Sequence, residues 1–335
     1  MPQDETRVWT PAEIMRTSGA YWMSSALHSA VALDIFTLLD GVSLTAEEIA
    51  AKAGCDRRGT STLLTALTAL RLLEKSGSTY ADCPAARQYL SARSPDYLGH
   101  IVLHHSHLVP AWSRLTEAVR AGAPTRESAH RSRDAEEREH FLLGMFNVAS
   151  QQAKLIADAL DFGDCADLLD LGGGPGAYAV HFCLKNPRLS AVIYDLPTTR
   201  PVAEKVLERF DLRGRVGFME GDFLKDPVAG RYDVVWISQV LHAMDDADAG
   251  TLLTKAAAAL KPRGRVFIQE FMLDDARDGP EHPALFGCNM LVGTERGKVY
   301  TRGELEGLLT KTGARRVFRV NIALPQGCAV MAGEF

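Results

Sequence analysis

The sequence predicts an α/β protein: a doubly wound, mostly parallel sheet that ends in an antiparallel hairpin, preceded by an all-α domain. Three observations predict this class. From residue 164 onward, candidate strands alternate with helical stretches. The first strand runs into the glycine-rich segment LLDLGGGPGAY at 168–178. The final segment, ARRVFRVNIALPQGCAVMAG, has the pattern of two strands around a short turn.

Length and composition indicate a soluble protein of two domains. The chain has 335 residues, 46% of them hydrophobic and 24% charged. Its net charge of −5 argues against nucleic acids and anionic membranes as partners. The six cysteines have no zinc spacing, so we expect free thiols in a reducing cytoplasm and no metal. We find no signal-peptide pattern in MPQDETRVWTP, and no apolar stretch is long enough to span a bilayer.

Residues 1–98 are expected to form the N-terminal domain. Residues 12–40 are apolar at helical spacing on more than one face, so this helix must be covered on most sides, in part by a second subunit. Thr45 and Glu48 form a capping box that opens a short helix. A second helix is expected at 59–72, followed by a hairpin in LLEKSGSTYAD. Helix, helix and hairpin is the order of a winged helix.

The charge of this winged-helix-like domain argues against DNA binding. A recognition helix and a wing need Lys and Arg side chains to meet phosphates. The helix here offers Arg57, Arg58 and Arg71, and the wing offers Lys75 beside Asp82. We therefore expect no nucleic-acid partner and interpret the domain as a module that helps to build a dimer.

Residues 99–335 are expected to form the second domain. Residues 99–160 are helical, with a break in the charged stretch AGAPTRESAHRSRDAEERE. The strand candidates that follow are 167–171, 190–195, 214–219, 232–237 and 264–270. Their alternation with helices predicts a parallel sheet, and the hairpin around LPQG adds a final antiparallel strand.

The glycine-rich segment predicts a ligand site. Glycines in a strand-to-helix turn let a ligand approach the backbone and a helix N-terminus. The segment lacks the Gly-Lys-Ser/Thr of a phosphate loop. The pyrophosphate of NAD would lie unfavourably close to the carboxylate of Asp170. S-adenosylmethionine suits Asp170 better, because it carries an ammonium and a sulfonium and no phosphate.

Two further acids follow later strands. Asp195 in YDLP ends the second strand, where a carboxylate can hold both ribose hydroxyls. Asp222 in EGDF ends the third, where it can meet the adenine amino group. Each acid alone is also typical of a turn or a helix cap. Three acids at successive strand ends, together with the terminal hairpin, favour S-adenosylmethionine as the cofactor.

These motifs resemble those of the class I small-molecule O-methyltransferases of the caffeate, acetylserotonin and bacterial polyketide-tailoring type. The resemblance covers nearly the whole chain and is most specific in DLGGGPG, YDLP, EGDF, SQVLHAMDD, GRVFIQE and the closing hairpin. It implies the methyltransferase sheet, a homodimer formed through the N-terminal domain, and S-adenosylmethionine. It also implies a small-molecule acceptor held between the helical segment at 99–160 and the C-terminal domain.

The resemblance assigns the cofactor site residue by residue. The family's positions fall on Asp170, Gly172, Gly174, Gly176, Asp195, Leu196, Asp222, Phe223 and Ser238. Ser238 stands where the family usually has a Lys near the methionine carboxylate. A hydroxyl can still donate a hydrogen bond to that carboxylate, but without the charge.

The resemblance also implies that His242 is the general base and Glu270 the first of two acids beside it. A neutral imidazole can take the proton of a hydroxyl, which contributes roughly 10²–10⁴ in rate, and a carboxylate on its far nitrogen fixes the tautomer. The alternative is a satisfied histidine at a strand end. The chain departs from the family at Ala243, where Asp is usual, and at Val299, where the second acid is expected. Glu295 is a nearby candidate to replace that acid.

The acceptor contacts are also carried over from the family. Phe141 and Met145 match its Phe-x-x-x-Met contacts, and Asn289 with Met290 matches the other wall. Phe and Met suit a flat, apolar acceptor. Each of these residues alone also fits an ordinary helix core.

The segment LHHSH at 103–107 has the most unusual composition in the chain. On a helix, His104 and His107 share a face, where they could bind a metal, contact an acidic acceptor or lie at the surface. The family's layout places the segment beside the acceptor pocket. We therefore include His104 and His105 among the acceptor contacts, with an anionic acceptor as the hypothesis.

Two alternatives stay open at this point. C- or S-methyl transfer to a keto acid or a thiol would use the same scaffold, with a metal in place of the missing acids. A cofactor-sensing transcription regulator would need the basic surface that the winged helix lacks.

Overall fold

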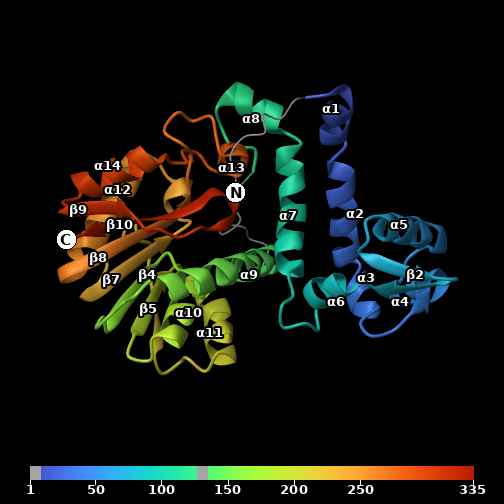
Figure 1. The fold of residues 1–335 in the computed structure, drawn as a ribbon, viewed down its shortest axis with the longest axis horizontal. Coiled ribbons are helices and arrows are strands. Elements are labelled where there is room, and N and C mark those ends of the chain that lie inside the picture. The colour runs from blue at the N-terminus through green and yellow to red at the C-terminus, as the bar shows by residue number, and fades with distance from the viewer. Residues whose placement is uncertain (1–8, 127–134) are drawn as a thin grey trace. The chain divides into compact units, whose positions relative to one another are not determined.

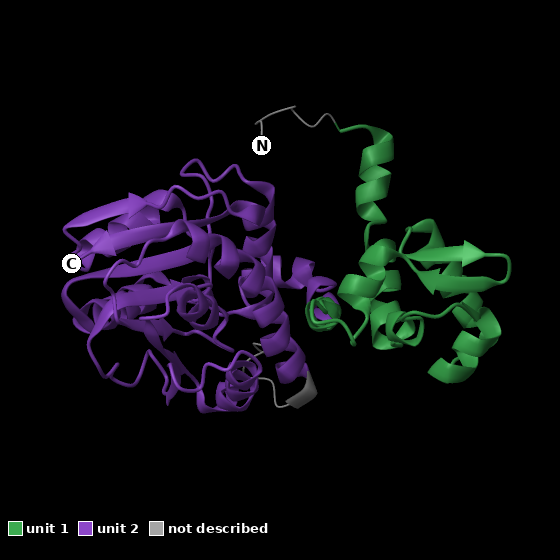
Figure 2. Ribbon diagram, turned by 60° about the horizontal axis from the view of Figure 1, so that its bottom comes forward, with its two compact units in different colours: residues 1–107 green, residues 108–335 purple. Residues whose placement is uncertain are grey.

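The computed structural model describes residues 9–126 and 135–335, and the chain forms two compact units, residues 1–107 and 108–335 (Figure 2). The predicted division after residue 98 falls just before α7 (Gly99–Trp112), the helix in which the chain passes from one unit to the other. Part of the predicted break at 121–139, and most of the N-terminal segment MPQDETRVWTP, lie outside the described residues.

Unit 1 is mainly helical and also contains a small sheet (Figure 1). Its helices before α7 are α1 (Pro11–Ser18), α2 (Tyr21–Ala32), α3 (Ile35–Leu38), α4 (Ala46–Ala53), α5 (Arg57–Ala69) and α6 (Pro84–Leu90). Its strands are β1 (Leu44–Thr45), β2 (Leu73–Ser76) and β3 (Thr79–Asp82), in the order β1-β3-β2. The predicted hairpin is β2–β3, and the predicted capping box of Thr45 opens α4.

The prediction of one helix over 12–40 is wrong, because the segment is divided into α1, α2 and α3. Gly19 follows α1, and Asp34 between α2 and α3 has a left-handed backbone with φ of 56°. Asp tolerates that conformation better than most residues because its short polar side chain bonds locally. Apolar periodicity continues across both breaks, which is why the pattern did not reveal them.

Unit 2 is a seven-stranded sheet with helices on both faces. Its strands are β4 (Asp167–Leu171), β5 (Ser190–Asp195), β6 (Val216–Glu220), β7 (Tyr232–Ser238), β8 (Leu260–Phe271), β9 (Arg316–Arg319) and β10 (Cys328–Glu334). Its helices after α7 are α8 (Leu115–Ala121), α9 (Ala135–Ala159), α10 (Ala177–Lys185), α11 (Arg200–Arg209), α12 (Asp246–Ala258), α13 (Glu281–Gly293) and α14 (Arg302–Lys311).

The strand order is β6-β5-β4-β7-β8-β10-β9, with β4 to β8 parallel. The predicted terminal hairpin is confirmed: β10 is antiparallel to both β8 and β9 and lies between them. Each of the five predicted strands is present: β4 and β5 have the predicted bounds, whereas the ends of β6, β7 and β8 are shifted. The parallel strands all point the same way, so their carboxyl ends form one edge of the sheet.

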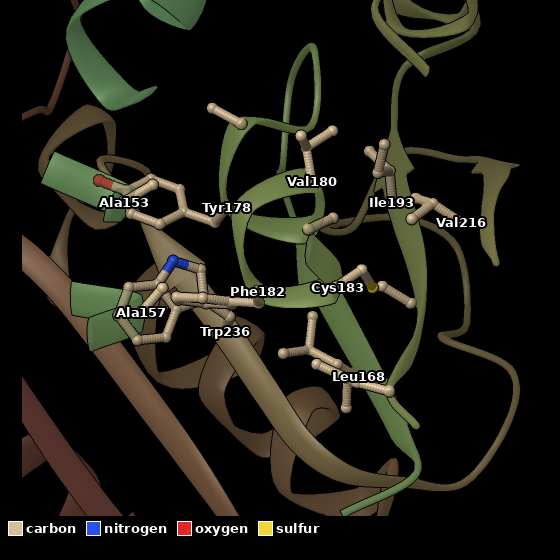
Figure 3. Packing of buried hydrophobic residues seen from close by; sticks show 14 of the residues in the cluster. Ala153, Ala157, Leu168, Tyr178, Val180, Phe182, Cys183, Ile193, Val216 and Trp236 are labelled. Atoms are coloured by element: carbon tan, nitrogen blue, oxygen red, sulfur yellow. The ribbon is translucent and has the colours of Figure 1, made fainter. Parts of the chain in front are cut away.

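Alternate residues of the strands enter two separate cores. Leu168 packs on one face with residues of α9 and α10, whereas Leu169 packs on the other face with residues of α12 and α14. On the first face Trp236 of β7 packs against Tyr178 and Phe182 of α10, with ring centroids 5.1 and 4.9 Å away (Figure 3). Burial on both faces explains why these strands are almost continuously apolar in the sequence.

Among the helices of 9–126 and 135–335, none has both the length and the apolar character needed to cross a membrane.

Candidate active site

The glycine loop between β4 and α10 has the backbone that the sequence suggested. Gly172 and Gly174 have φ of +73° and +55°, a region that side chains disfavour. A Cβ on Gly172 would lie 2.7 Å from Cγ2 of Val240. A Cβ on Gly174 would meet nothing within 4 Å. Gly172 is therefore needed for packing, whereas Gly174 borders open space. Gly176, with φ of +84°, is the residue before α10.

Asp170 lies in β4 and is completely buried. Its Oδ2 accepts a hydrogen bond of 3.2 Å from the N–H of Ala179, and its Oδ1 has no hydrogen-bond partner among the described residues. Burial, together with the nearby charge of Asp195, raises the pKa of Asp170 to about 7, although the hydrogen bond from Ala179 lowers it. A buried acceptor without a donor is costly. Its surroundings therefore fit a cationic, phosphate-free ligand.

Asp195 at the end of β5 connects the second strand to the glycine loop. Its Oδ2 accepts from the N–H of Gly174 at 2.8 Å, and its Oδ1 accepts from the N–H of Leu196 at 2.7 Å and from Thr199 at 3.0 Å. Burial raises its pKa despite these bonds. A carboxylate has about four acceptor positions, so three are filled by the protein.

Asp222 and Phe223 follow β6. Asp222 accepts from the N–H of Leu224 at 3.0 Å and pairs with Lys225 at 2.8 Å. Although partial burial raises the pKa of Asp222, these contacts lower it below its usual value. The ring of Phe223 would lie 3.5 Å from a Cβ on Gly172. The EGDF segment and the glycine loop are thus neighbours.

His242 and Glu270 are in direct contact at the same edge of the sheet. Nδ1 of His242 lies 2.8 Å from Oε2 of Glu270, whose Oε1 accepts from the N–H of Leu241 at 2.8 Å. His242 follows β7 in a short 3₁₀ turn, Leu241–Ala243, and Glu270 is near the end of the adjacent strand β8. The Glu270 side chain is 1% exposed and that of His242 is 13% exposed. A carboxylate at Nδ1 leaves Nε2 as the basic nitrogen.

The segment at 297–300 packs against the turn that carries His242. The N–H of Lys298 donates to the carbonyl of His242 at 2.9 Å, and Tyr300 donates to that of Met244 at 3.1 Å. Val299 is buried, whereas Glu295 and Ala243 are exposed. An apolar side chain therefore occupies the position where the family has its second acid.

Ser238 at the end of β7 belongs to a buried polar network. Its hydroxyl donates to Oε1 of Gln269 at 2.5 Å, and the hydroxyl of Tyr178 donates to the same oxygen at 3.1 Å. Gln269 in turn donates to Gln152 of α9 at 2.7 Å. In this arrangement the single proton of Ser238 is directed to Gln269, so the hydroxyl must reorient to donate to a methionine carboxylate.

Two family models match this chain. An O-methyltransferase domain matches residues 112–315, and an O-methyltransferase dimerisation domain matches residues 15–92. The chain belongs to the O-methyltransferase family. It is a methyltransferase, and the prediction of S-adenosylmethionine as its cofactor is confirmed.

Named members of the family extend over nearly the full chain. A 3-hydroxy-5-methyl-1-naphthoate 3-O-methyltransferase of Streptomyces sahachiroi is 33% identical over 93% of this chain and 92% of its own. The tetracenomycin polyketide synthesis 8-O-methyl transferase of Streptomyces glaucescens is 34% identical over 97% of each.

Solved structures of O-methyltransferases have the same fold. A family protein from Burkholderia thailandensis has a TM-score of 0.88 at 29% identity and covers 98% of both chains. Human N-acetylserotonin methyltransferase, solved in complex with S-adenosylmethionine, has a TM-score of 0.86 at 25% identity and covers 99% of both.

The four acceptor residues predicted in unit 2 of this O-methyltransferase lie on two helices. Phe141 and Met145 are half-buried and one turn apart on α9. Asn289 and Met290 are on α13, where Met290 is buried and Oδ1 of Asn289 accepts from the indole N–H of Trp112 at 3.1 Å. Because the carbonyl oxygen of the Asn289 side chain accepts this bond, its amide N–H groups can donate to other groups.

The histidines of LHHSH are in α7 and belong to unit 1. His104 is buried, whereas His105 and His107 are exposed. His104 and His107, which were expected to share a helix face, therefore differ in burial. In the described parts of the chain, no three His, Cys, Asp or Glu side chains gather as a metal site would require. Acceptor contact by His104 and His105 stays a prediction.

Three further residues at or near the site were not predicted as site residues from the sequence: Phe286, Trp112 and Gln269. Phe286 contacts His242, Trp112 binds Asn289, and Gln269 links α9 to the sheet. Helical spacing could have revealed Phe286, since it lies three residues before Asn289 and therefore on the same face of α13. No local pattern marks the other two, whose partners are far away in the sequence.

Proposed function

We propose that this chain transfers the methyl group of S-adenosylmethionine to a hydroxyl group of a small, flat acceptor, with His242 as the general base. The observation that carries the proposal is the 2.8 Å contact between His242 and the buried Glu270 at the carboxyl edge of the sheet. The carboxylate holds one ring nitrogen and leaves the other, Nε2, able to accept a proton.

The donor would be held by the three acids and the glycine loop. When bound, it supplies a methyl group that its sulfonium makes reactive. We assign Asp170 to the ammonium, Asp195 with Leu196 to the ribose, and Asp222 with Phe223 to the adenine. The backbone of the glycine loop, at Gly172, Gly174 and Gly176, would contact the donor. Ser238 would lie near its methionine carboxylate.

His242 would take the proton of the acceptor hydroxyl at Nε2 while the oxygen attacks. A hydroxyl with a pKa near ~10 is mostly protonated at neutral pH, whereas an unperturbed imidazole is mostly neutral. Glu270 would hold the Nδ1–H tautomer and stabilise the imidazolium that forms. Alignment of the reacting atoms can lower the activation barrier further, by up to about 7–11 kcal/mol.

The acceptor class is inferred from the lining residues and from the relatives. Phe141, Met145, Asn289 and Met290 would offer an apolar wall with one polar group, which suits a flat aromatic ring. Two relatives are named for O-methylation in naphthoate and tetracenomycin chemistry. We therefore favour a hydroxyl on an aromatic ring, with His104 and His105 as contacts for an anionic substituent.

We also propose that residues 1–98, which make up most of unit 1, form a winged-helix-like dimerisation module. The match to a dimerisation domain over residues 15–92 supports a homodimer. The helix and hairpin that would meet DNA offer few cations, namely Arg57, Arg58, Arg71 and Lys75, which supports a partner other than nucleic acid. For the location we propose the cytoplasm, because the six cysteines are free thiols, as expected in a reducing compartment.

His242→Gln tests the base. We expect methyl transfer to fall at least tenfold, because glutamine cannot accept the proton, while S-adenosylhomocysteine binds with nearly unchanged affinity. Turnover and calorimetric titration measure the two effects. Unchanged turnover would remove His242 from the role.

The acceptor is identified by uptake of labelled methyl from S-adenosylmethionine. The panel should contain phenols and naphthols, with thiols and keto acids to test S- and C-methylation. Nuclear magnetic resonance of the product identifies the methylated atom. Uptake confined to thiols or keto acids would overturn O-methylation.

A further inference from the structure

Phe286 of α13 lies against the imidazole of His242. Their ring centroids are 4.9 Å apart, and the ring planes are nearly perpendicular at 85°. Such an edge-to-face contact is a favourable geometry for two aromatic rings. Phe286 therefore touches the side chain that the proposed function makes the base.

The hydrogen bond to Glu270 cannot hold that imidazole by itself. It fixes one atom, Nδ1, at 2.8 Å from Oε2. Because the ring is attached to the backbone only through Cβ, coupled rotations about χ1 and χ2 can still pivot the ring about the line from Cβ to Nδ1. Such a pivot would swing Nε2, which lies off that line, away from its direction. A second contact that fixes the ring plane removes this freedom.

Phe286 is itself held by the end of β8. Its centroid lies 4.7 Å from that of Phe271, which in turn lies 4.8 Å from that of His282. Phe271 follows Glu270 directly in the chain. The last two residues of β8 therefore restrain His242 twice, through the carboxylate of Glu270 and through the stack of Phe271 and Phe286.

Among the residues that the structure describes, Glu270 is the only side chain hydrogen-bonded to the imidazole. The next residue on α13, Gly287, faces Val299, since a Cβ on Gly287 would lie 3.9 Å from its Cγ2. Val299 is 3% exposed. This side of the turn that carries His242 is thus closed by apolar groups of α13 and the segment at 297–300.

We propose that Phe286 is a positioning residue for methyl transfer: it fixes the plane of the His242 imidazole and so keeps Nε2 directed at the acceptor hydroxyl. This inference depends on the proposed function of His242. It assigns Phe286 no contact with the donor. It makes the aromatic ring, rather than apolar bulk alone, the property that position 286 requires.

A double-mutant cycle with His242 tests the inference. Phe286→Leu keeps an apolar side chain but removes the ring, and we expect kcat to fall about tenfold, since misdirecting a base forfeits part of its contribution. In the His242→Gln background, the same substitution should change kcat less than about twofold, because no base remains to be directed. Leu285→Ala, an exposed neighbour on α13, should leave kcat unchanged in both backgrounds.

Two measurements separate positioning from a general loss of structure. The thermal unfolding midpoint and the affinity for S-adenosylhomocysteine should be close to those of the original chain in Phe286→Leu. In protein labelled with ¹⁵N-histidine, the Nδ1–H signal of His242 should exchange faster with water once the ring is free to turn.

The outcomes are distinct. Equal losses of kcat in both backgrounds, or a raised acceptor KM with unchanged kcat, overturn the inference and make Phe286 a pocket wall or a core residue. An unchanged rate in His242→Gln alone overturns the proposed base, and this inference with it. A tenfold loss only in the presence of His242 supports positioning.

Discussion

Asp170 is a buried carboxyl group whose hydrogen-bonding capacity the described fold fills only in part. Its carboxyl group is fully buried, and one oxygen lacks a hydrogen-bond donor among the described residues. Burial, with the charge of Asp195, raises its pKa to about 7. Above that pH, the ligand-free protein holds an uncompensated negative charge, which a cationic ligand would neutralise.

This raised pKa predicts how stability changes with pH. An unfolded Asp titrates near about 3.9, so between about pH 4 and pH 7 the folded state binds a proton that the unfolded state has released. The stability that Asp170 contributes is complete below pH ~4 and is lost as the pH rises through about 7. Asp170→Asn removes this titration, so its free energy of unfolding should fall less between pH 5 and pH 8.

Calorimetric unfolding of the ligand-free proteins at several pH values measures the difference. Asp82, whose pKa burial also raises to about 7, is present in both proteins and cancels. Identical pH slopes for the two proteins would contradict the prediction. The Asn variant should also bind S-adenosylhomocysteine more weakly, because it lacks the charge that attracts the ammonium.

At the residue scale, the sequence predicted pairs that lie near each other through strand order but not those made by packing. Glu270 was predicted to lie beside His242 from the family resemblance; the two are at the ends of adjacent strands, and their contact is 2.8 Å. The engagement of Ser238 by Gln269, and of Asn289 by Trp112, depends on side-chain packing between distant segments. No sequence pattern encodes such contacts.

The glycine loop is the element whose individual glycines can be told apart by experiment. Both Gly172→Ala and Gly174→Ala place a side chain at positive φ, which costs about 1–2 kcal/mol each. Gly172→Ala also strikes Val240, so it should destabilise the fold by about 1–3 kcal/mol more. Gly174→Ala should instead weaken ligand binding, because its methyl group enters open space beside the loop.

Urea unfolding and titration with S-adenosylhomocysteine separate these effects. We expect the larger loss of unfolding free energy in Gly172→Ala and at least a tenfold loss of affinity in Gly174→Ala. Equal stability of the two variants would show that Val240 moves aside without cost.

Elements were predicted well where their ends are marked by chemistry. The capping box at Thr45 and the glycine at 176 open their helices where expected. The prediction of one helix over 12–40 failed because the apolar spacing persists through the breaks between the helices. The break at Asp34 depends on a left-handed backbone conformation, which the apolar pattern does not reveal. Strand β1 has two residues, too few for any periodic pattern.

On the scale of the whole molecule, α1 and α2 carry exposed apolar residues that are candidates for the interface of the proposed homodimer. Met15, Tyr21, Trp22 and Met23 are each more than half exposed in the single chain, with Met15 at 73% and Trp22 at 70%. Large apolar patches of this kind mark interaction surfaces. Together with the match to a dimerisation domain, they support the proposed homodimer through unit 1.

Charge on this surface should separate the subunits. We expect the combined change Trp22→Glu and Met23→Glu to convert the dimer into a monomer, because two buried carboxylates per subunit would lack partners. Light scattering measures the mass. Leu155→Glu, on an exposed residue of unit 2, is the matched control and should stay dimeric. A dimer that survives the double change would place the interface elsewhere.

The interleaved order of the last strands constrains how the sheet is completed during folding. Within the described chain, β9 pairs with β10 alone, yet it precedes β10 and is separated from it by eight residues. It cannot dock on β8 first, because β10 occupies that place. Strand β9 must therefore join the sheet together with β10 or after it. Until β10 docks, the open border of β8 is available to other chains, and misassembly would begin there.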